Sequence, residues 1–293
     1  MPAPGGESGG PGLPPGAGRL RCGRHAFGLA RPLVMGVLNL TPDSFSDGGR
    51  FIDVSVAVAH ALAMVEQGAD LLDLGAESTR PGAAPVPAAQ EIDRLMPVLE
   101  RLRDCGCALS VDTRKPEVMR AAIAAGADMI NDVGGFADPA ARDAVAADAR
   151  VACCVMHMQG DPLTMQQAPA YRDVVVEVRD RLVARAAALQ DRGVSADRIV
   201  VDPGIGFGKT LEHNLSLLGR LDLLAAAGWT VMVGVSRKSM LGALTGRSVG
   251  ERLPAGLAAM LAAVARGARI VRVHDVAPTR DALEVWSAIA DAR

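Results

Sequence analysis

Aromatic residues are scarce in this 293-residue chain, since Phe, Trp and Tyr together make up 3% of it. Hydrophobic residues nevertheless account for 49%, so a core has to be built from Ala, Val, Leu and Ile. The scarcity excludes a core of large aromatic rings. The abundance of small and branched aliphatic residues allows one large core of another kind.

The chain has no marked excess of either charge, because 31 Lys and Arg residues stand against 33 Asp and Glu residues. This balance leaves no broad electrostatic surface for nucleic acid or an anionic membrane. The sequence also lacks an uninterrupted apolar run of about 18 residues, and residues 1–18 contain no hydrophobic secretory core. We therefore expect a cytoplasmic protein with small-molecule substrates and no nucleic-acid or membrane partner.

Cysteine is present in an odd number, five, and its spacing does not indicate a metal site. One residue separates Cys105 from Cys107, where a zinc site usually has two. Cys153 and Cys154 are adjacent inside an apolar run. We expect free thiols in a reducing compartment.

Glycine and proline dominate residues 1–18, which therefore offer no apolar face to a core and are expected to form a disordered tail. From residue 31 to residue 293, short apolar runs alternate with stretches of helical character. The apolar runs are Leu33–Leu38, Leu71–Leu74, Ala108–Val111, Met129–Ile130, Val151–Val155, Ile199–Val201, Val231–Val235 and Ile270–Val273. The helical stretches include Val54–Gln67, Gln90–Asp104, Glu117–Ala125, Val174–Asp191, Leu211–Leu224, Leu253–Arg266 and Thr279–Ala290. Near-continuous apolar character is typical of parallel strands covered by helices.

Eight strands that alternate with helices favour a closed (β/α)₈ barrel of the α/β class over an open doubly wound sheet, which usually has five or six strands. We expect residues 31–293 to form one barrel domain. The connections after the first and second strands, residues 40–51 and 77–87, are too long and too polar for simple turns. We expect both to be mobile loops over the mouth of the barrel.

The apolar runs end in polar residues, and the C-terminal ends of parallel barrel strands meet at one mouth. The residues at these ends are Asn39, Glu77, Ser78, Thr79, Asp112, Asn131, Met156, His157, Asp202, Ser236, Lys238, Arg272 and His274. Their positions predict a single active site.

Nucleotide-binding motifs are not present with the required spacing. Three residues lie between Gly204 and Gly208, whereas the phosphate-binding loop of nucleotide hydrolases has four. The same glycines lack the spacing of a dinucleotide site, so we expect them to let the backbone approach a planar ligand. Lys238 could alternatively form a Schiff base, as lysines of some barrel enzymes do.

The polar segments occur in an order and spacing that resemble a known enzyme family. The segments are LNLTPDSFSDGG, LDLGAESTRPGA, SVDTRKPEV, INDV, VMHMQGDPLTMQ, DPGIGFGK, VGVSRKSM and RVHDV. They resemble the dihydropteroate synthases of bacterial folate biosynthesis over residues 32–293. The resemblance implies a barrel enzyme that joins para-aminobenzoate to 6-hydroxymethyl-7,8-dihydropterin pyrophosphate, giving 7,8-dihydropteroate and pyrophosphate.

The resemblance assigns pterin binding to residues at the strand ends. A pterin ring presents adjacent donors and acceptors, which a carboxylate such as Asp202 can read through two hydrogen bonds. Asn131 offers both a donor and an acceptor, Lys238 can donate to the ring carbonyl and a ring nitrogen, and Met156 flanks the ring. Asp112 is expected to stabilise positive charge on the pterin after the bond to pyrophosphate breaks. Alternatively, Asp112 caps the helix that follows it.

Pyrophosphate binding is expected from the last strand. Arg272 and His274 alternate with valines, so both lie on one face of that strand and suit a phosphate group. The resemblance adds Thr79 and Arg80, together with Asn39 as the one identifiable protein ligand of Mg²⁺, the expected cofactor. The residues expected to be catalytic are Asp112, Lys238, Arg272 and His274.

The resemblance also indicates where the second substrate and a second subunit bind. The expected aminobenzoate residues are Phe45, Thr79, Arg80, Pro81, Phe207 and Ser236. Ser236 precedes a helix that begins in SRKSM, and free N–H groups at the start of a helix attract a carboxylate. The family further implies a homodimer, formed through the last helices.

Two other functions fit a barrel that binds a pterin. A pterin-dependent methyltransferase would read the same ring with a similar Asp and Asn, but it has no need of anion-binding residues such as Thr79, Arg80, Arg272 and His274. A non-catalytic pterin-binding paralogue would have lost an essential group, and no assigned residue is missing. The synthase is therefore the preferred interpretation.

Overall fold

The computed structural model describes residues 18–41, 53–78 and 82–292. Residues 1–17, nearly all of the expected tail, lie outside this part of the chain, as do residues 42–52 of the first long loop and residues 79–81 of the second. Four predicted site residues therefore lie outside the described residues, namely Phe45, Thr79, Arg80 and Pro81.

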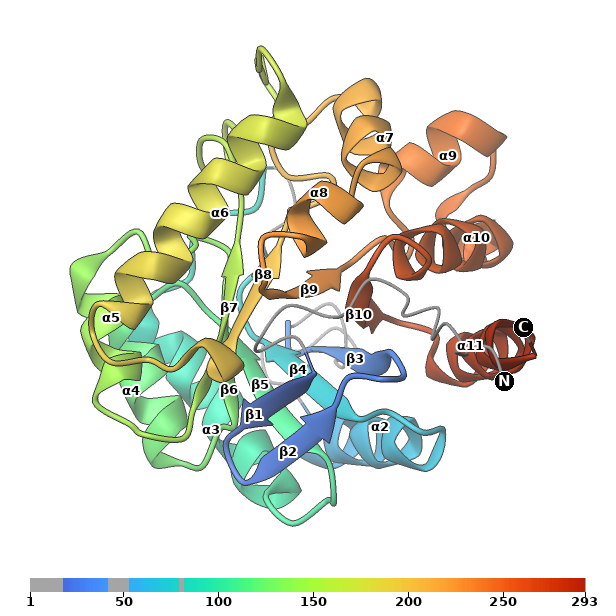
Figure 1. The fold of residues 1–293 in the computed structure, drawn as a ribbon. Coiled ribbons are helices and arrows are strands. Elements are labelled where there is room, and N and C mark those ends of the chain that lie inside the picture. The colour runs from blue at the N-terminus through green and yellow to red at the C-terminus, as the bar shows by residue number, and fades with distance from the viewer. Residues whose placement is uncertain (1–17, 42–52, 79–81, 293) are drawn as a thin grey trace, which may run out of the picture.

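Eight strands close into a parallel barrel in the order β10-β3-β4-β5-β6-β7-β8-β9. The strands are β3 (Leu33–Asn39), β4 (Leu71–Gly75), β5 (Ala108–Asp112), β6 (Met129–Asp132), β7 (Ala152–Met156), β8 (Ile199–Asp202), β9 (Thr230–Val233) and β10 (Ala268–Val273). Each predicted apolar run corresponds to one strand, and the predicted (β/α)₈ barrel is confirmed. Figure 1 shows the strands enclosed by helices.

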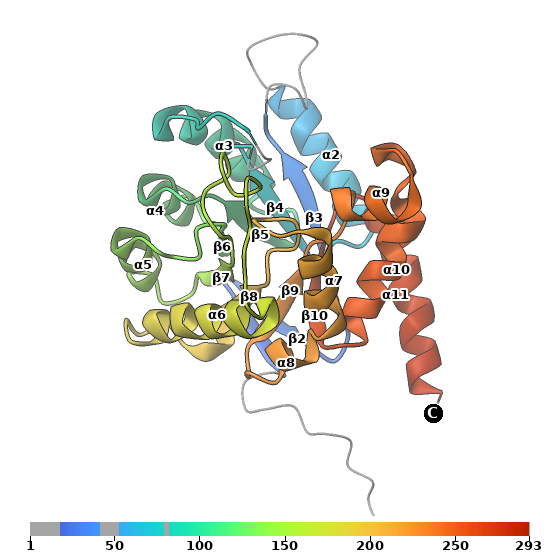
Figure 2. The ribbon, with the colours of Figure 1, turned by 90° about the horizontal axis from the view of Figure 1, so that it is seen from above.

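Helices lie around the outside of the strands (Figure 2). They are α2 (Val54–Glu66), α3 (Ala88–Leu102), α4 (Pro116–Ala124), α5 (Pro139–Ala146), α6 (Val174–Gln190), α7 (Leu211–Gly219), α8 (Asp222–Ala225), α9 (Ser239–Thr245), α10 (Leu253–Val264) and α11 (Val276–Asp291). Short 3₁₀ turns occupy Ala196–Arg198 and Val249–Glu251. None of the helices in the described part of the chain combines the length and apolar character needed to cross a membrane.

Two helical details differ from the sequence-based expectation. The stretch expected as one helix over Leu211–Leu224 is two helices, because Arg220 leaves the helical region with φ −122° and ψ 30°. Helix α5 was not expected. It begins after Asp138, whose carboxylate accepts a hydrogen bond from the backbone N–H of Ala140, and it has Pro139 in its first turn.

The inner face of the barrel changes from apolar at one end to polar at the other. Side chains of a strand alternate between its two faces. On β5, Ala108 belongs to the apolar cluster inside the barrel, while Leu109 and Val111 pack in the cluster between strands and helices. The next inward positions on β5 are Ser110 and Asp112, both buried. The alternation therefore directs polar groups to the C-terminal end of the barrel interior.

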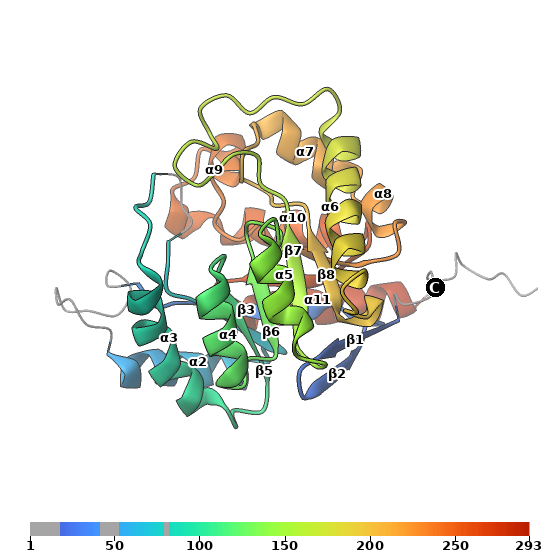
Figure 3. The same ribbon diagram turned by 90° about the vertical axis from the view of Figure 1, so that its left-hand side faces the viewer.

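A short hairpin closes the other end of the barrel. Its strands are β1 (Arg19–Cys22) and β2 (His25–Gly28), which pair in antiparallel register. Leu20 and Leu29 are fully buried in the cluster inside the barrel. Figure 3 shows the hairpin at the opposite end from the loop that precedes α6. Sequence analysis did not predict this hairpin, because two four-residue strands carry too short a pattern to distinguish from a loop.

Replacing Leu20 by Ala is expected to lower the free energy of unfolding by about 2–5 kcal/mol, because it opens a cavity under the barrel core. Arg19→Ala is the matched control, since Arg19 lies on the same strand and is exposed. Urea unfolding of both variants measures the difference. Equal stability of the two variants would show that the hairpin does not contribute to the core.

Candidate active site

Five side chains from four strands form a hydrogen-bonded network at the polar end of the barrel interior. Asp73 on β4 lies at its centre: the Ser110 hydroxyl donates to Oδ1 at 2.6 Å, and Asn131 Nδ2 donates to Oδ2 at 3.0 Å. The Arg272 guanidinium donates through Nε to Asp73 Oδ2 at 2.6 Å and through Nη2 to Asp112 Oδ2 at 3.0 Å. Three predicted site residues, Asp112, Asn131 and Arg272, are thus brought together.

Sequence analysis missed Asp73, because it interpreted Leu71–Leu74 as an unbroken apolar run. Period-two alternation could have found it, since Asp73 lies two residues from the inward-facing Leu71. The barrel register pairs Asp73 with Ser110, and the Asp73 side chain is completely buried. A buried carboxylate requires charged or hydrogen-bonding partners, and Arg272 is the charged one.

Two buried oxygens in the network have no hydrogen-bond donor within the described residues. They are Asp112 Oδ1 and Asn131 Oδ1. The two residues are direct neighbours on β5 and β6. Because an unsatisfied buried acceptor costs roughly 1–3 kcal/mol, the pair favours a ligand that brings adjacent N–H donors to this position.

The charged groups of the network shift one another's proton affinity. Burial raises the pKa of the Asp112 carboxyl to about 7, and the Asp73 carboxylate adds to this rise while Arg272 opposes it. Burial lowers the pKa of the Lys238 ammonium to about 8, and the charge of Arg272 lowers it further. Burial would also lower the pKa of Arg272, but the carboxylates of Asp73 and Asp112 outweigh it and raise that pKa. Asp112 and Lys238 therefore titrate near neutral pH, as groups at active sites often do.

Asp202 ends strand β8, as the sequence pattern predicted. Its Oδ1 accepts a hydrogen bond from the backbone N–H of Gly204 at 2.7 Å, which leaves Oδ2 for a ligand. Burial raises the pKa of this carboxyl, while the Gly204 hydrogen bond and the Lys238 charge oppose the rise. Lys238 Nζ lies 4.1 Å from the centre of the Phe207 ring, a cation–π contact that orients the ammonium group.

His274 and Ser236 contact each other directly. The backbone N–H of His274 donates to Ser236 Oγ at 3.3 Å, and the same oxygen lies 3.1 Å from His274 Nδ1. A hydroxyl group can donate one hydrogen bond and accept two, so this contact is a hydrogen bond with either tautomer of the ring. Burial lowers the pKa of His274 to about 4, helped by the charges of Arg237 and Arg272. His274 is therefore a neutral imidazole at pH 7.

Lys209 is a second buried charged residue that sequence analysis missed. Its Nζ donates to the carbonyls of Phe207 at 2.9 Å and His157 at 3.2 Å, and lies 3.1 Å from His157 Nδ1. Lys209 thereby connects the loop after β8 to the loop after β7.

Two glycines of the loop after β8 allow the same two loops to approach each other. A Cβ at Gly204 would lie 2.0 Å from the His157 carbonyl oxygen, and one at Gly208 would lie 2.6 Å from a backbone oxygen of the loop after β7. These two glycines permit contact between the loops. That the glycines here let the backbone approach a planar ligand stays a prediction.

Glu77, Asn39 and Met156 are further described residues at the strand ends. Glu77 accepts a hydrogen bond from Lys115 Nζ at 2.6 Å, and Lys115 also binds buried Glu91, so this carboxylate anchors the second loop. Asn39 ends β3 between β10 and β4 and is partly buried. Met156 ends β7 and is 6% exposed.

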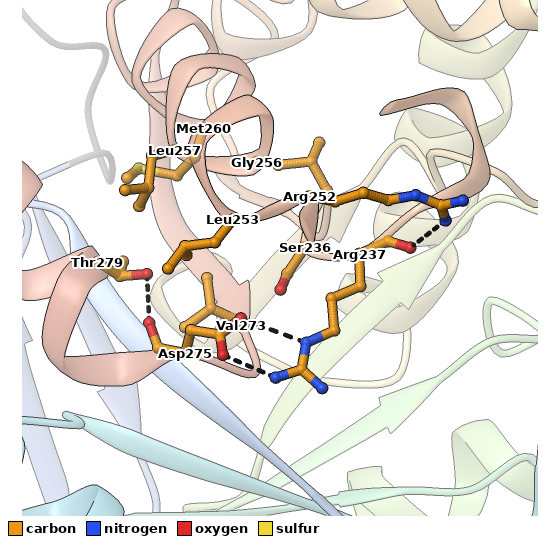
Figure 4. A pocket seen from close by; sticks show the side chains of 11 residues that line it. Ser236, Arg237, Arg252, Leu253, Gly256, Leu257, Met260, Val273, Asp275 and Thr279 are labelled. Atoms are coloured by element: carbon orange, nitrogen blue, oxygen red, sulfur yellow. Dashed lines mark hydrogen bonds and ion pairs between the residues drawn. The ribbon is translucent and has the colours of Figure 1, made fainter. Parts of the chain in front are cut away.

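A small cavity lies behind Ser236, between α10, α11 and the end of β10 (Figure 4). Its volume is about 20 Å³, which is enough for one water molecule and not for a substrate. Arg237, at φ 60°, reaches across its edge to Asp275, with Nη2 and Oδ1 2.7 Å apart. This ion pair holds the segment between β9 and α9, and with it Ser236 and Lys238.

Comparison with known proteins identifies the family. The family model described as pterin binding enzyme matches residues 35–274. A dihydropteroate synthase of Neisseria meningitidis serogroup C is 48% identical over 273 residues, which covers 92% of this chain and 96% of that protein.

Two solved structures resemble the whole barrel. The dihydropteroate synthase of Burkholderia cenocepacia, complexed with 7,8-dihydropteroate, is 51% identical with a TM-score of 0.85 and covers 94% of this chain and 97% of its own. The Xanthomonas albilineans dihydropteroate synthase with 4-aminobenzoic acid is 51% identical with a TM-score of 0.87. It covers 93% of this chain and 98% of its own. The fold, the family model and this degree of identity agree, and the chain belongs to the dihydropteroate synthase family of pterin-binding enzymes.

Proposed function

We propose that the protein joins para-aminobenzoate to 6-hydroxymethyl-7,8-dihydropterin pyrophosphate, forming 7,8-dihydropteroate and releasing pyrophosphate. The observation that carries this proposal is the pair of buried acceptors, Asp112 Oδ1 and Asn131 Oδ1, next to the Arg272 guanidinium. A pterin supplies the N–H donors that these oxygens lack, and its pyrophosphate supplies an anion for the guanidinium.

The pterin ring is oriented by groups of opposite hydrogen-bonding character. Asp202 accepts through Oδ2, since its Oδ1 is bound to the Gly204 N–H. The hydrogen bond from Asn131 Nδ2 to Asp73 fixes the orientation of the Asn131 amide, so that Asn131 accepts through Oδ1. Lys238 donates from the opposite side, and Met156 flanks the ring. A ligand without this pattern would leave buried groups unpaired, so the arrangement selects strongly for a pterin.

Loss of pyrophosphate before attack by the amine leaves positive charge on the pterin methylene and ring. The ionised form of Asp112 stabilises this charge in the transition state, where stabilisation increases the rate. Arg272 holds Asp112 in place through Oδ2, which leaves Oδ1 to face the ring. The amine of para-aminobenzoate then attacks the cation and needs no strong base.

Pyrophosphate is bound by Arg272 and His274, with Mg²⁺ at Asn39. Arg272 has donors beyond the two used by the carboxylates, and the neutral His274 imidazole carries one N–H that can donate. Strand β3, which Asn39 ends, pairs with β10, which carries Arg272. The described residues contain no group of three or more His, Cys, Asp or Glu side chains suited to a metal. A single amide oxygen fits a Mg²⁺ ion that is otherwise bound by pyrophosphate and water, and the ion would neutralise the leaving group.

The aminobenzoate site lies on the side of Ser236 and Phe207. Both residues are adjacent to the other machinery, since Ser236 contacts His274 and Phe207 contacts Lys238. Phe45, Thr79, Arg80 and Pro81, which lie outside the described residues, stay predictions for this site, as do Thr79 and Arg80 for pyrophosphate. The cytoplasmic location also stays a prediction.

The test of the proposed reaction is pyrophosphate release by purified protein supplied with the dihydropterin pyrophosphate and Mg²⁺, with and without para-aminobenzoate. We expect release coupled to 7,8-dihydropteroate formation, and loss of coupled product when Mg²⁺ is chelated. Tight pterin binding without turnover would contradict the proposal and favour a silent paralogue or a methyltransferase.

The pH dependence of kcat/KM is expected to be bell-shaped, with limbs near pH 7 and pH 8. Below about 7, Asp112 gains a proton and no longer stabilises the cation; above about 8, Lys238 loses its positive charge, and its neutral amine is a weaker donor to the pterin ring. Lys238→Arg should abolish the alkaline limb, because arginine stays protonated. A profile that is flat from pH 6 to pH 9 would contradict these assignments.

Asp73→Asn is expected to move the acid limb to lower pH by roughly one unit or more, because the Asp73 charge contributes to the raised pKa of Asp112. Ser110→Ala is the matched control. It removes a hydrogen bond to Asp73 without changing charge, so its acid limb should stay near 7. The kcat/KM profiles of the two variants provide the comparison, and identical profiles would show that Asp73 does not control Asp112.

We also propose that the protein forms a homodimer through α11. Val285 and Ile289 lie one helical turn apart on one face of α11 and are 61% and 62% exposed. Replacing both by Asp is expected to convert the dimer to a monomer in sedimentation velocity experiments, with secondary structure unchanged. A monomeric wild-type protein, or a variant that stays dimeric, would contradict this interface.

A further inference from the structure

The turn between α3 and β5 brings two cysteine sulfurs into contact. Cys105 and Cys107 flank Gly106, and their Sγ atoms lie 3.4 Å apart. Gly106 has φ +89°, a conformation that favours glycine, and a Cβ added there would meet nothing within 4 Å. The turn thus combines close sulfur atoms with free space around the residue between them.

The two thiols have different surroundings. Cys105 is partly exposed, whereas Cys107 is 4% exposed and packs in the apolar core. The hydrogen bond between the sulfurs, backbone N–H groups and the Arg24 guanidinium stabilise the Cys105 thiolate, and they lower the pKa of Cys105 to about 6 although burial opposes this. The pKa of Cys107 is raised, first by the same hydrogen bond and then by burial. Cys105 is therefore the nucleophile and Cys107 the proton-bearing neighbour.

The other three cysteines provide an internal reference. Cys22, Cys153 and Cys154 are 0% exposed. Burial raises the pKa of Cys153 to about 12, and it raises the pKa values of Cys22 and Cys154 as well. Buried thiols that stay protonated do not react with oxidants in solution. Reactivity should therefore be confined to the turn.

We propose that Cys105 and Cys107 are a peroxide-reactive dithiol that closes to a disulfide, in which Cys105 attacks the oxidant and Cys107 resolves the product. The oxidant is hydrogen peroxide or an organic hydroperoxide. Closure requires the sulfurs to approach from 3.4 Å to about 2.05 Å.

The reaction balances with the two thiols and one peroxide molecule. The Cys105 thiolate attacks one peroxide oxygen, the O–O bond breaks, and hydroxide or alkoxide leaves, giving a sulfenic acid at Cys105. The Cys107 sulfur then attacks Cys105 Sγ, so that an S–S bond forms and the S–O bond breaks. The released hydroxyl leaves as water with the Cys107 proton. Two thiols are oxidised by two electrons, and one peroxide is reduced.

The dithiol lies at the end of β5 opposite to the catalytic groups. Cys107 immediately precedes Ala108, the first residue of β5, whereas Asp112 is the last. At about 3.3 Å per residue, the intervening strand separates the two ends by on the order of 16 Å. Oxidation is therefore expected to change the rate of the proposed condensation by less than about twofold, and the test below does not depend on that reaction.

The experiment treats the reduced full-length protein with a small excess of hydrogen peroxide at pH 7, followed by denaturation, thiol alkylation and mass spectrometry. We expect two of the five thiols to be lost, a mass decrease of about 2 Da before alkylation, and a bond that peptide mapping places between Cys105 and Cys107. Five alkylated thiols after treatment, or a bond that involves any other cysteine, would overturn the proposal.

Matched variants separate the two roles. Cys107→Ser should trap the sulfenic acid, seen as a dimedone adduct on Cys105, and form no disulfide. Cys105→Ser should react at least tenfold more slowly than wild type, and Cys153→Ser should react like wild type. The rate of Cys105 alkylation by iodoacetamide should rise with a midpoint near pH 6. Equal peroxide reactivity of Cys105→Ser and Cys153→Ser would overturn the assignment of Cys105 as the attacking group.

Discussion

The Arg272 guanidinium lies between the carboxylates of Asp73 and Asp112, and this buried ion cluster determines the chemistry of the barrel mouth. Removing the cation would leave two buried carboxylates close together without compensation, which is far more costly than the net value of either ion pair. Arg272 therefore has a structural role as well as its proposed role toward pyrophosphate. Two of its N–H groups donate to the carboxylates, and the remaining N–H groups are available for pyrophosphate.

The charge balance of the mouth suits a reaction that passes through a cation. Asp73, Asp112 and Asp202 supply three carboxylates, and Arg272 and Lys238 supply two cations. When all five are ionised this set carries one excess negative charge, and the buried Lys209 ammonium, whose pKa burial lowers to about 7, offsets part of it at neutral pH. Because Asp112 has a pKa of about 7, this excess is present only when its proton is absent. The same carboxylate thus provides both the catalytic charge and its sensitivity to pH.

Strand order and most of the mouth could be predicted from sequence because both depend on local patterns. Each apolar run became a strand, and residues such as Asp112 and Asp202 end strands as expected. Contacts across the barrel could not be predicted in this way, because the bonds from Arg272 to Asp73 and Asp112 depend on how strands far apart in sequence face one another. Lys209 was missed for that reason, because it is paired with groups from a different loop. Asp73 was missed although its inward position two residues after Leu71 follows from local alternation.

The hairpin at the other end of the barrel has an electrical consequence for the mouth. Leu20 and Leu29 fill the space below the polar layer with hydrocarbon, a medium of low dielectric constant. Field lines from the buried carboxylates cannot be screened from that side and emerge mainly toward the open mouth. Residues 19–29 thereby act as an insulating base, concentrating the field of the active site in the direction from which ligands arrive.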